Sequence, residues 1–364
     1  MKNILLVTLQ GSNIGNRLQN FALQSVLENY QCKVTNLTYW APEFDTARKR
    51  TKFLIKVILG LGGIKKYNFQ VYRAKREIAF HRFNIHNISN MLRIKFETVD
   101  KKNWGSYDFA ISGSDQVWHN WSGKPEELRY FYLQFMPIDR RIAYAASFGF
   151  EHFPVNDEII HQKCLREIHY ISVREKSGAK LVRQICNKDV SITLDPTLLL
   201  TSTQWKQKMH CPKYHLQKKY VLVYFLGKIT SECDKFIQKI SEDKNIQIIN
   251  IYSENELEYF ATAPDEFLWL VKNAFYVVTD SFHASVFSIL FHKNLMVFNR
   301  KEKGFANMFA RIETLLDLCG LGNIIEDNYA CIETQKQNWE DIDKKIDYYR
   351  NESLTWLKNV LIHT

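Results

Sequence analysis

The sequence predicts an α/β protein in which two Rossmann-like domains face a central cleft. Along most of the chain, short apolar segments with strand character alternate with segments whose apolar residues recur at helical spacing. The chain has 364 residues, which is long for a single hydrophobic core. One polar, irregular stretch, residues 201–219, interrupts the series and indicates a linker between two domains.

The first predicted domain spans residues 1–205 and opens with a βαβ unit. This unit comprises a strand at 1–9, a turn at 11–16, a helix at 17–27 and a strand at 33–37. After an interruption, further strands are expected at 107–112, 141–147, 170–174 and 192–196, with helices at 164–169 and 177–185. Polar residues follow the carboxyl end of each strand, as a ligand-binding crevice requires.

The second predicted domain spans residues 206–345 and repeats the alternation. Its expected strands are 220–225, 246–251, 276–278 and 294–298, and its expected helices are 231–240, 284–290, 312–318 and one that starts at 264. A last helix covers 339–363, and residues 346–364 are expected to cross back onto the first domain. The sizes of the two domains match the glycosyltransferase-B type of architecture.

Composition excludes several classes of protein. Apolar residues make up 46% of the chain and aromatic residues 14%, which excludes global disorder. No uninterrupted apolar stretch of about 18 residues occurs, so no membrane-spanning helix is expected. Residues 1–7 are too short an apolar run for a signal peptide and no small-residue cleavage pattern follows, so we expect a cytoplasmic protein. The seven cysteines are scattered without a CxxC pair, which argues against zinc ligation and a disulfide framework.

The net charge of +10 is concentrated in one segment. Residues 48–82 contain eleven Lys or Arg and one Glu, interleaved with many apolar and aromatic residues. Such a segment can lie on an anionic membrane surface, or it can form a helical insertion that packs on the core with a solvated basic face. No zinc-finger, RNA-recognition or helix-turn-helix signature is present, so no nucleic-acid partner is expected.

The most informative stretch is residues 276–290. Its pattern predicts a buried strand followed directly by a buried helix, with Asp280, Ser281 and His283 at the junction. Ligands bind at such junctions in open α/β sheets, and the amino end of a helix favours a phosphate or a carboxylate. A histidine at this place can also carry a proton near neutral pH.

Seven motifs in the same order resemble the polysaccharide pyruvyl transferase family. They are NIGNRLQNFAL (13–23), GSDQVW (113–118), YAASFG (144–149), SVRE (172–175), LDPTLL (194–199), PDEFL (264–268) and TDSFHA (279–284). The match runs from about residue 5 to about residue 320. The resemblance implies a glycosyltransferase-B-like fold and transfer of a pyruvyl group from phosphoenolpyruvate to a sugar diol as a cyclic ketal, with release of phosphate. The implied acceptor is a surface polysaccharide or a lipid-linked oligosaccharide precursor, and the resemblance implies no cofactor beyond the donor substrate.

The donor carries a phosphate and a carboxylate, so its site needs at least two pockets rich in cations or N–H groups. Arg174, at a strand end, suits a planar carboxylate because of its fork geometry, and the resemblance points to the same residue. The alternative is a structural ion pair between Arg174 and Glu175 or another acid.

This chain departs from the family at Ser281, where many relatives carry an arginine. Ser281 supplies no cation. Arg300, Lys301 or Lys303, which follow the strand at 294–298, are expected to supply the charge instead. The second domain is therefore expected to hold the donor.

Two residues are candidates for proton transfer. His283 is expected to donate a proton to the methylene carbon of the donor or to contact its phosphate, unless it only caps its own helix. Asp115 follows a glycine turn and is expected to orient or deprotonate the acceptor hydroxyl, unless it only caps that turn. For Asp195, which precedes Pro196, we favour a domain-joining turn over a catalytic role.

The acceptor is expected on the first domain. A polar cluster follows the first strand and comprises Asn13, Gly15, Asn16 and Gln19. Gly15 alone is also explained by a turn. Trp118, like Trp121, offers a ring for stacking on a sugar, with buried packing as the alternative.

Two other functions remain open from the sequence. One is a nucleotide-sugar-dependent glycosyltransferase of the same architecture. The other is a non-catalytic glycan-binding relative, for which the missing arginine at position 281 is the best support. No metal-binding signature occurs, so metal-independent transfer is the simplest mechanism.

Overall fold

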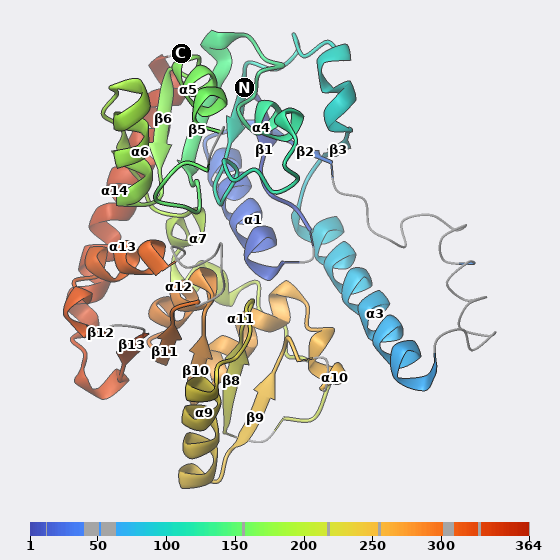
Figure 1. Ribbon diagram of the computed structural model, residues 1–364, viewed down its shortest axis with the longest axis vertical. Coiled ribbons are helices and arrows are strands. Elements are labelled where there is room, and N and C mark those ends of the chain that lie inside the picture. The colour runs from blue at the N-terminus through green and yellow to red at the C-terminus, as the bar shows by residue number, and fades with distance from the viewer. Residues whose placement is uncertain are drawn as a thin grey trace.

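The computed structural model describes residues 1–11, 13–39, 51, 63–154, 157–216, 219–253, 256–300, 309–326 and 329–363. Figure 1 shows two α/β units, one above the other, each built on its own sheet. The predicted fold class is therefore confirmed.

The first sheet has seven strands within the described residues, in the order β3-β2-β1-β4-β5-β6-β7. All neighbouring strands pair in parallel, which is the doubly wound order of a Rossmann domain. The central strand β1 contributes four fully buried residues, as expected for a parallel strand covered on both faces. The strands are β1 (Asn3–Val7), β2 (Lys33–Thr38), β3 (Met91–Arg93), β4 (Phe109–Ser112), β5 (Arg141–Ala146), β6 (Tyr170–Val173) and β7 (Ser191–Ile192).

Helices cover both faces of the first sheet (Figure 1). The helices of this domain are α1 (Ile14–Asn29), α3 (Gly63–Asn87), which extends along the second domain, α4 (Pro125–Phe131), α5 (Glu158–Arg166) and α6 (Lys176–Cys186), with 3₁₀ turns η1 (Phe96–Lys101) and η2 (Ile138–Arg140). The turn expected at 11–16 is wrong in its second half. Helix α1 begins at Ile14, because the side chain of Asn13 accepts hydrogen bonds from the backbone of Gly15 and Asn16 and caps the helix.

The second sheet has the order β12-β13-β11-β10-β8-β9 within the described residues. Strands β9, β8, β10 and β11 pair in parallel, and β13 and β12 add antiparallel strands at one edge that the sequence did not indicate. The strands are β8 (Tyr220–Tyr224), β9 (Gln247–Asn250), β10 (Tyr276–Thr279), β11 (Asn294–Phe298), β12 (Ile325–Glu326) and β13 (Tyr329–Ile332). The helices and 3₁₀ turns are α9 (Ser231–Lys244), α10 (Leu257–Phe260), α11 (Pro264–Asn273), α12 (Phe282–Leu290), α13 (Ala310–Leu318), η4 (Gly322–Ile324), η5 (Thr334–Lys336) and α14 (Trp339–His363).

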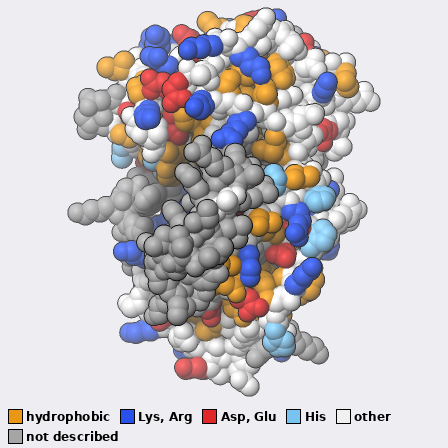
Figure 2. All heavy atoms as spheres, turned by 90° about the vertical axis from the view of Figure 1, so that its right-hand side faces the viewer, with side chains coloured by type: hydrophobic (Ala, Val, Ile, Leu, Met, Phe, Trp, Pro, Cys, Tyr) orange, Lys and Arg blue, Asp and Glu red, His pale blue; other side chains and the backbone are white. Residues whose placement is uncertain are grey.

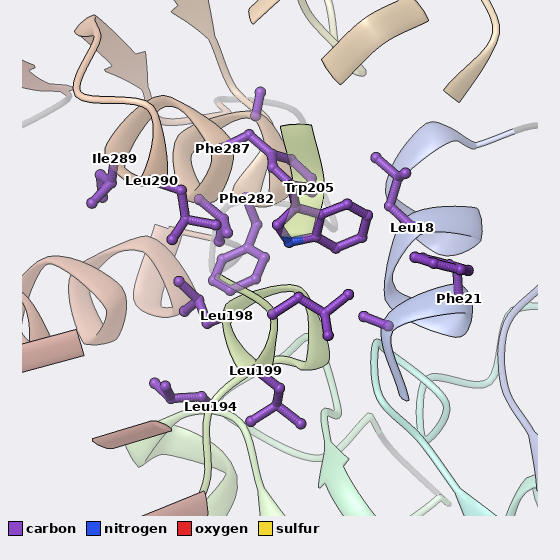
Figure 3. Packing of buried hydrophobic residues seen from close by; sticks show 14 of the residues in the cluster. Leu18, Phe21, Leu194, Leu198, Leu199, Trp205, Phe282, Phe287, Ile289 and Leu290 are labelled. Atoms are coloured by element: carbon purple, nitrogen blue, oxygen red, sulfur yellow. The ribbon is translucent and has the colours of Figure 1, made fainter. Parts of the chain in front are cut away.

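A hydrophobic cluster joins the two domains. Two short helices, α7 (Pro196–Leu199) and α8 (Ser202–Lys206), lie between them, so the beginning of the predicted linker is helical and partly buried. Trp205 lies between Phe21 of α1 and Phe287 of α12, with ring centroids 5.7 and 5.0 Å away, as Figure 3 shows. Its indole N–H donates to the carbonyl of Thr197 at 2.9 Å. This tryptophan is therefore a core residue of the domain interface.

Helix α14 runs along both domains (Figure 1). At its start, Trp339 stacks on His292 of the second domain. Further along, Arg350 donates to the carbonyl of Leu198, and Ser353 accepts from the backbone N–H of Leu194. Its final turn reaches the beginning of the chain, so α14 contacts the second domain, the connecting segment and the first domain in turn.

Helix α3 carries the described part of the basic segment. Its Arg76 is buried, donates to the carbonyl of Phe260 at 2.7 Å and lies against the rings of Phe80 and Tyr252. One face of α3 therefore packs on the second domain. The opposite face is exposed and lies on the side of the molecule shown in Figure 2, where basic, histidine and apolar side chains are interspersed. Residues 48–50 and 52–62 of the segment lie outside the described residues, and no helix that the structure describes is long and apolar enough to span a bilayer.

Candidate active site

A cavity of about 390 Å³ lies between the two domains, at the carboxyl ends of their parallel strands. The residues that line it include Asn13, Asn16, Asp115 and Trp121 from the first domain, and Ser281, His283, Arg300 and Arg311 from the second. Six of the predicted site residues therefore meet at one place, although the elements that carry them are far apart in the sequence: Asn13, Asn16, Asp115, Ser281, His283 and Arg300.

Asp115 projects from the loop that follows β4. Its backbone has a φ of 76°, a left-handed conformation that non-glycine residues adopt rarely and at a cost. The Oδ1 atom of Asp115 accepts a hydrogen bond from the backbone N–H of Gln116 at 2.9 Å and faces a guanidinium nitrogen of Arg174 at 3.3 Å. The carboxylate is thus held in one orientation at the cavity wall.

Arg174 lies beneath the cavity and does not line it. Its guanidinium faces three carboxylates: Asp195 at 2.8 Å, Asp115 at 3.3 Å and Glu175 at 3.6 Å. It also lies over the ring of Phe282, 4.5 Å from the centroid. Burial alone would lower the pKa of Arg174, but the three carboxylates raise it above its ordinary value. These contacts match the alternative raised by the sequence, in which Arg174 forms structural ion pairs. Its guanidinium already has carboxylate partners within the chain.

Asp195 is part of the site as well as of a turn. Its Oδ1 atom caps α7 by accepting from the backbone N–H and the hydroxyl of Thr197, and its Oδ2 atom accepts from Ser114 and Arg174. The same Oδ2 atom lies 3.6 Å from Nε2 of His283. Burial would raise the pKa of Asp195, but the nearby His283 and Arg174 hold it well below its usual range. Asp195 therefore stays ionised, and the sequence reasoning missed its contact with His283.

His283 occupies the first turn of α12 and is 7% exposed. Its Nε2 atom is buried and has no hydrogen-bond partner among the described residues. On its other side, the ring lies against α1: a Cβ atom built on Gly15 would be 2.1 Å from Nδ1 of His283. Gly15 is therefore required by a close approach between the two domains, and its backbone is helical.

Ser281 caps α12 at the cavity wall. Its hydroxyl accepts from the backbone N–H of Ala284 at 3.4 Å. Every residue of α12 is buried, because this helix lies between the second sheet and the first domain. The amino end of the helix, with its partial positive charge, consequently adjoins the cavity.

Asp280 organises the loop after β8. Its two carboxylate oxygens accept from the backbone N–H groups of Leu226 and Gly227, both at 2.8 Å, and Oδ2 also accepts from Nε of Arg300 at 2.7 Å. Arg300 is thereby held at the cavity wall. The other two expected donor contacts, Lys301 and Lys303, lie outside the described residues.

Arg311 is a cavity residue that the sequence reasoning did not find. It lies in the first turn of α13, is 8% exposed, and its Nε atom is buried without a hydrogen-bond partner among the described residues. Burial lowers the pKa of Arg311 to about 10, and the neighbouring cations Arg174 and Arg300 add to this effect. No local motif surrounds this residue, so the sequence offered no signal for it.

The expected acceptor residues divide into two groups. Asn13 and Asn16 line the cavity, and Trp121 does so with 43% of its surface exposed. Gln19 is buried behind them, where its amide donates to Thr8. Trp118 is fully buried and stacks on Tyr132, so the structure does not bring this ring to the cavity.

Tyr39 is a second cavity residue that the sequence reasoning missed. It directly follows the carboxyl end of β2, at the same edge of the first sheet as the loop after β4 that carries Asp115. Burial and Glu127 raise the pKa of Tyr39 to about 12, against the opposing effect of Arg17. Its phenol therefore stays protonated at neutral pH and can donate a hydrogen bond.

Comparison with known proteins shows the family and the type of fold. A sequence profile described as polysaccharide pyruvyl transferase matches residues 13–302. Among solved structures, one from Listeria monocytogenes assigned as a UDP-N-acetylglucosamine 2-epimerase is similar with a TM-score of 0.50 and 11% identity, and the match covers 100% of this chain and 97% of that one. The UDP-GlcNAc 2-epimerase of Neisseria meningitidis, 10% identical, has a TM-score of 0.47 with both chains covered completely. At these identities the likeness concerns the fold alone. No match was found among curated proteins.

Proposed function

Because this chain belongs to the polysaccharide pyruvyl transferase family, we propose that it moves a pyruvyl group from phosphoenolpyruvate to a sugar diol of a surface polysaccharide or lipid-linked oligosaccharide precursor. The product is a cyclic ketal, and phosphate leaves. The observation that carries this proposal is the cavity between the domains, which His283, Arg300 and Arg311 all line, with the buried Asp195 3.6 Å from His283.

His283 is the proton donor in this mechanism. It protonates the methylene carbon of the enol phosphate, which becomes the methyl group and leaves a cationic centre at the adjacent carbon. The ionised Asp195, 3.6 Å away, stabilises the imidazolium before it donates its proton. Asp195 acts on the reaction only through His283 and is therefore a positioning residue.

Asp115 assists the attack of the acceptor. One sugar hydroxyl adds to the cationic carbon and its proton passes to Asp115, phosphate then leaves that carbon, and the second hydroxyl closes the ketal. Asp115 passes its proton to the departing phosphate, and the proton of the second hydroxyl replaces the one that His283 gave to the methyl group, so the enzyme returns to its starting state. The fixed orientation of the Asp115 carboxylate at the cavity wall supports this role.

The two domains divide the substrates between them. The sugar lies against Asn13, Asn16 and Trp121, whose exposed indole offers an apolar face for a sugar ring. The donor lies against the second domain, near the amino end of α12 and Arg300. Because Arg174 is engaged by three carboxylates, we assign it to holding Asp115 and Asp195 rather than to binding the donor.

A turnover assay tests the proposed function. Phosphoenolpyruvate and a panel of oligosaccharides are mixed with the enzyme, and phosphate release and the mass of the acceptor are followed. We expect stoichiometric phosphate and pyruvylated product, and a loss of roughly 10²–10⁴-fold in rate for His283→Gln. Retained glycan binding without transfer would contradict a catalytic role, and turnover of a nucleotide sugar without phosphoenolpyruvate would assign the cavity to glycosyl transfer.

The exposed face of α3 suits a lipid-linked acceptor. Lys75 and Arg82 lie on this face together with the exposed apolar side chains of Ile78 and Ile85. A helix face of this kind binds anionic membrane surfaces, which would hold the enzyme at the cytoplasmic face of the membrane. Flotation with anionic vesicles should recover the protein, and Lys75→Glu/Arg82→Glu should not float. If both proteins float equally, or if the unmodified protein does not float, membrane binding through this face is not part of the proposed function.

A further inference from the structure

Arg311 differs from the other buried arginines near the domain interface. Arg174 faces three carboxylates, and Arg350 donates to a backbone carbonyl and to Asp347. Arg311 is nine-tenths buried, yet no hydrogen bond or ion pair engages it among the described residues. A buried charge without a partner is costly, so proteins normally neutralise it or pair it. Arg311 lines the cavity, where a bound anion can pair with it.

The surroundings of Arg311 favour an anion with more than one negative charge. Arg300 lines the same wall, and both it and Arg174 lower the pKa of Arg311, which means that their positive charges adjoin it. The amino end of α12, capped by Ser281, adds a partial positive charge and backbone N–H groups nearby. Asp115 and Glu175 offset part of this charge but make no direct contact with Arg311.

We infer that Arg311 is the anchor of the donor's phosphate dianion. A guanidinium presents parallel N–H donors that match two phosphate oxygens, and pairing with a dianion relieves the repulsion from Arg300 and Arg174. The identification of the anion as a donor phosphate rests on the proposed function. The anion site itself rests on the cavity, the burial of Arg311 and the lack of a hydrogen-bond or ion-pair partner among the described residues, where its guanidinium meets only the ring of Phe282, 6.0 Å from the centroid.

The position of Arg311 depends on both domains. Helix α13 packs against α12 of the second domain and against α6 of the first. The backbone N–H of Lys176, two residues after Arg174, donates to the hydroxyl of Thr314 at 3.5 Å, and the Lys176 ammonium pairs with Asp317 at 2.7 Å. These contacts join α13 to the start of α6, next to Arg174, so the helix that carries the phosphate anchor is connected to the segment that holds the proton-transfer residues.

The experiment combines melting temperatures with binding of inorganic phosphate, phosphoenolpyruvate and UDP by calorimetry. The variants are Arg311→Met, which removes the charge but keeps an unbranched apolar stem, Arg311→Lys, which keeps the charge but loses the fork, and Arg183→Met as the control. Arg183 is exposed and pairs with Asp189 on the surface of α6. We expect Arg311→Met to melt at or above the temperature of the unmodified protein without ligand, because it removes an unpaired buried charge. We also expect it to bind phosphate and phosphoenolpyruvate at least tenfold more weakly, with Arg311→Lys between the two and Arg183→Met unchanged.

The outcomes separate this inference from the proposed function. Unchanged phosphate affinity in Arg311→Met, or no binding of phosphate or phosphoenolpyruvate by the unmodified protein, overturns the anchor. If Arg311→Lys folds as the unmodified protein does and binds phosphate equally well, the fork is not used and the anchor is again overturned. A different result is that Arg311→Met loses phosphate affinity while the unmodified protein binds UDP more tightly than phosphoenolpyruvate. Arg311 then remains the phosphate anchor, and phosphoenolpyruvate is not the donor. Full pyruvyl transfer by Arg311→Met overturns the anchor and leaves the function standing.

Discussion

Gly15 of the first domain lies directly against His283 of the second, with room for a hydrogen atom but not for a methyl group. A Cβ atom at position 15 would be 2.1 Å from Nδ1 of the imidazole and 2.5 Å from its Cγ atom. The proposed proton donor is therefore positioned by the backbone of the opposite domain.

Gly15→Ala should consequently damage activity more than stability. The backbone at position 15 is helical and accepts alanine, so the imidazole has to move instead. Because a displacement of about 1 Å can cost about 10²-fold in rate, we expect kcat to fall by that factor. Steady-state kinetics and a melting curve measure both effects. Gly178→Ala is the matched control, since it is another helical glycine whose added methyl group meets only ordinary contacts. Equal kcat values for the two variants would show that the ring is not held by position 15.

Asp195→Asn should lower both activity and stability near neutral pH. The surroundings of Asp195 depress its pKa in the folded protein, so its contribution to stability is complete above the ordinary carboxyl pKa of about 4 and is lost as the pH falls through the folded value. Breaking such a buried pair costs about 3–5 kcal/mol. Urea unfolding at pH 7 should show this difference from the unmodified protein, and the difference should narrow at pH values below about 4. If the difference in free energy of unfolding stays constant or grows as the pH falls, Asp195 is not ionised in the folded state.

Substitutions of Trp121 and Trp118 should have different effects, the first on binding of the acceptor and the second on stability. Trp121 lines the cavity and is half-exposed, so Trp121→Ala should raise the KM for the sugar, by about tenfold for the loss of one stacking face, and leave binding of the donor unchanged. Trp118→Phe, in the core, should lower the melting temperature and leave both KM values unchanged. The proposed acceptor wall is wrong if Trp121→Ala has the acceptor KM of the unmodified enzyme.

Trp205→Ala should weaken the interface between the domains. This side chain is fully buried between α1 and α12, and removal of a buried tryptophan costs about 3–5 kcal/mol. Urea unfolding should show this loss. Trp205→Phe keeps most of the packing and loses the hydrogen bond to Thr197, so about 1 kcal/mol is expected. Equal losses for the two variants would show that the hydrogen bond, and not the packing between the domains, is what this residue contributes.

The fold could be predicted because parallel strands buried on both faces are nearly continuous apolar runs. The strand predicted at 294–298 has the same bounds as β11, and the strand predicted at 276–278 is one residue shorter than β10. Short or partly polar elements were missed, among them α4 and the antiparallel strands β12 and β13, because their positions depend on packing against distant segments.

The candidate site was predictable where chemistry is tied to a local motif. His283, Ser281 and Asp115 each follow a buried strand, and the structure places all three at one cavity. Arg174 also follows a strand, but its orientation depends on three carboxylates, of which Asp115 and Asp195 are distant in the sequence. Arg311 belongs to a helix with no motif, so only the three-dimensional arrangement reveals it.

The course of α14 brings the two ends of the chain together. The ammonium group of Lys2 donates to the carbonyl of Leu361, so β1 and the last turn of α14 are neighbours. The chain therefore leaves the first domain through α7 and α8 and returns to it along α14. The second domain is thus connected to the first at both of its ends. Two connections restrict the relative motion of the domains more than a single one would. Relative motion of the lobes should accordingly be a narrow rocking that widens and narrows the mouth between Trp121 and Arg300, without a twist that would take His283 away from Gly15.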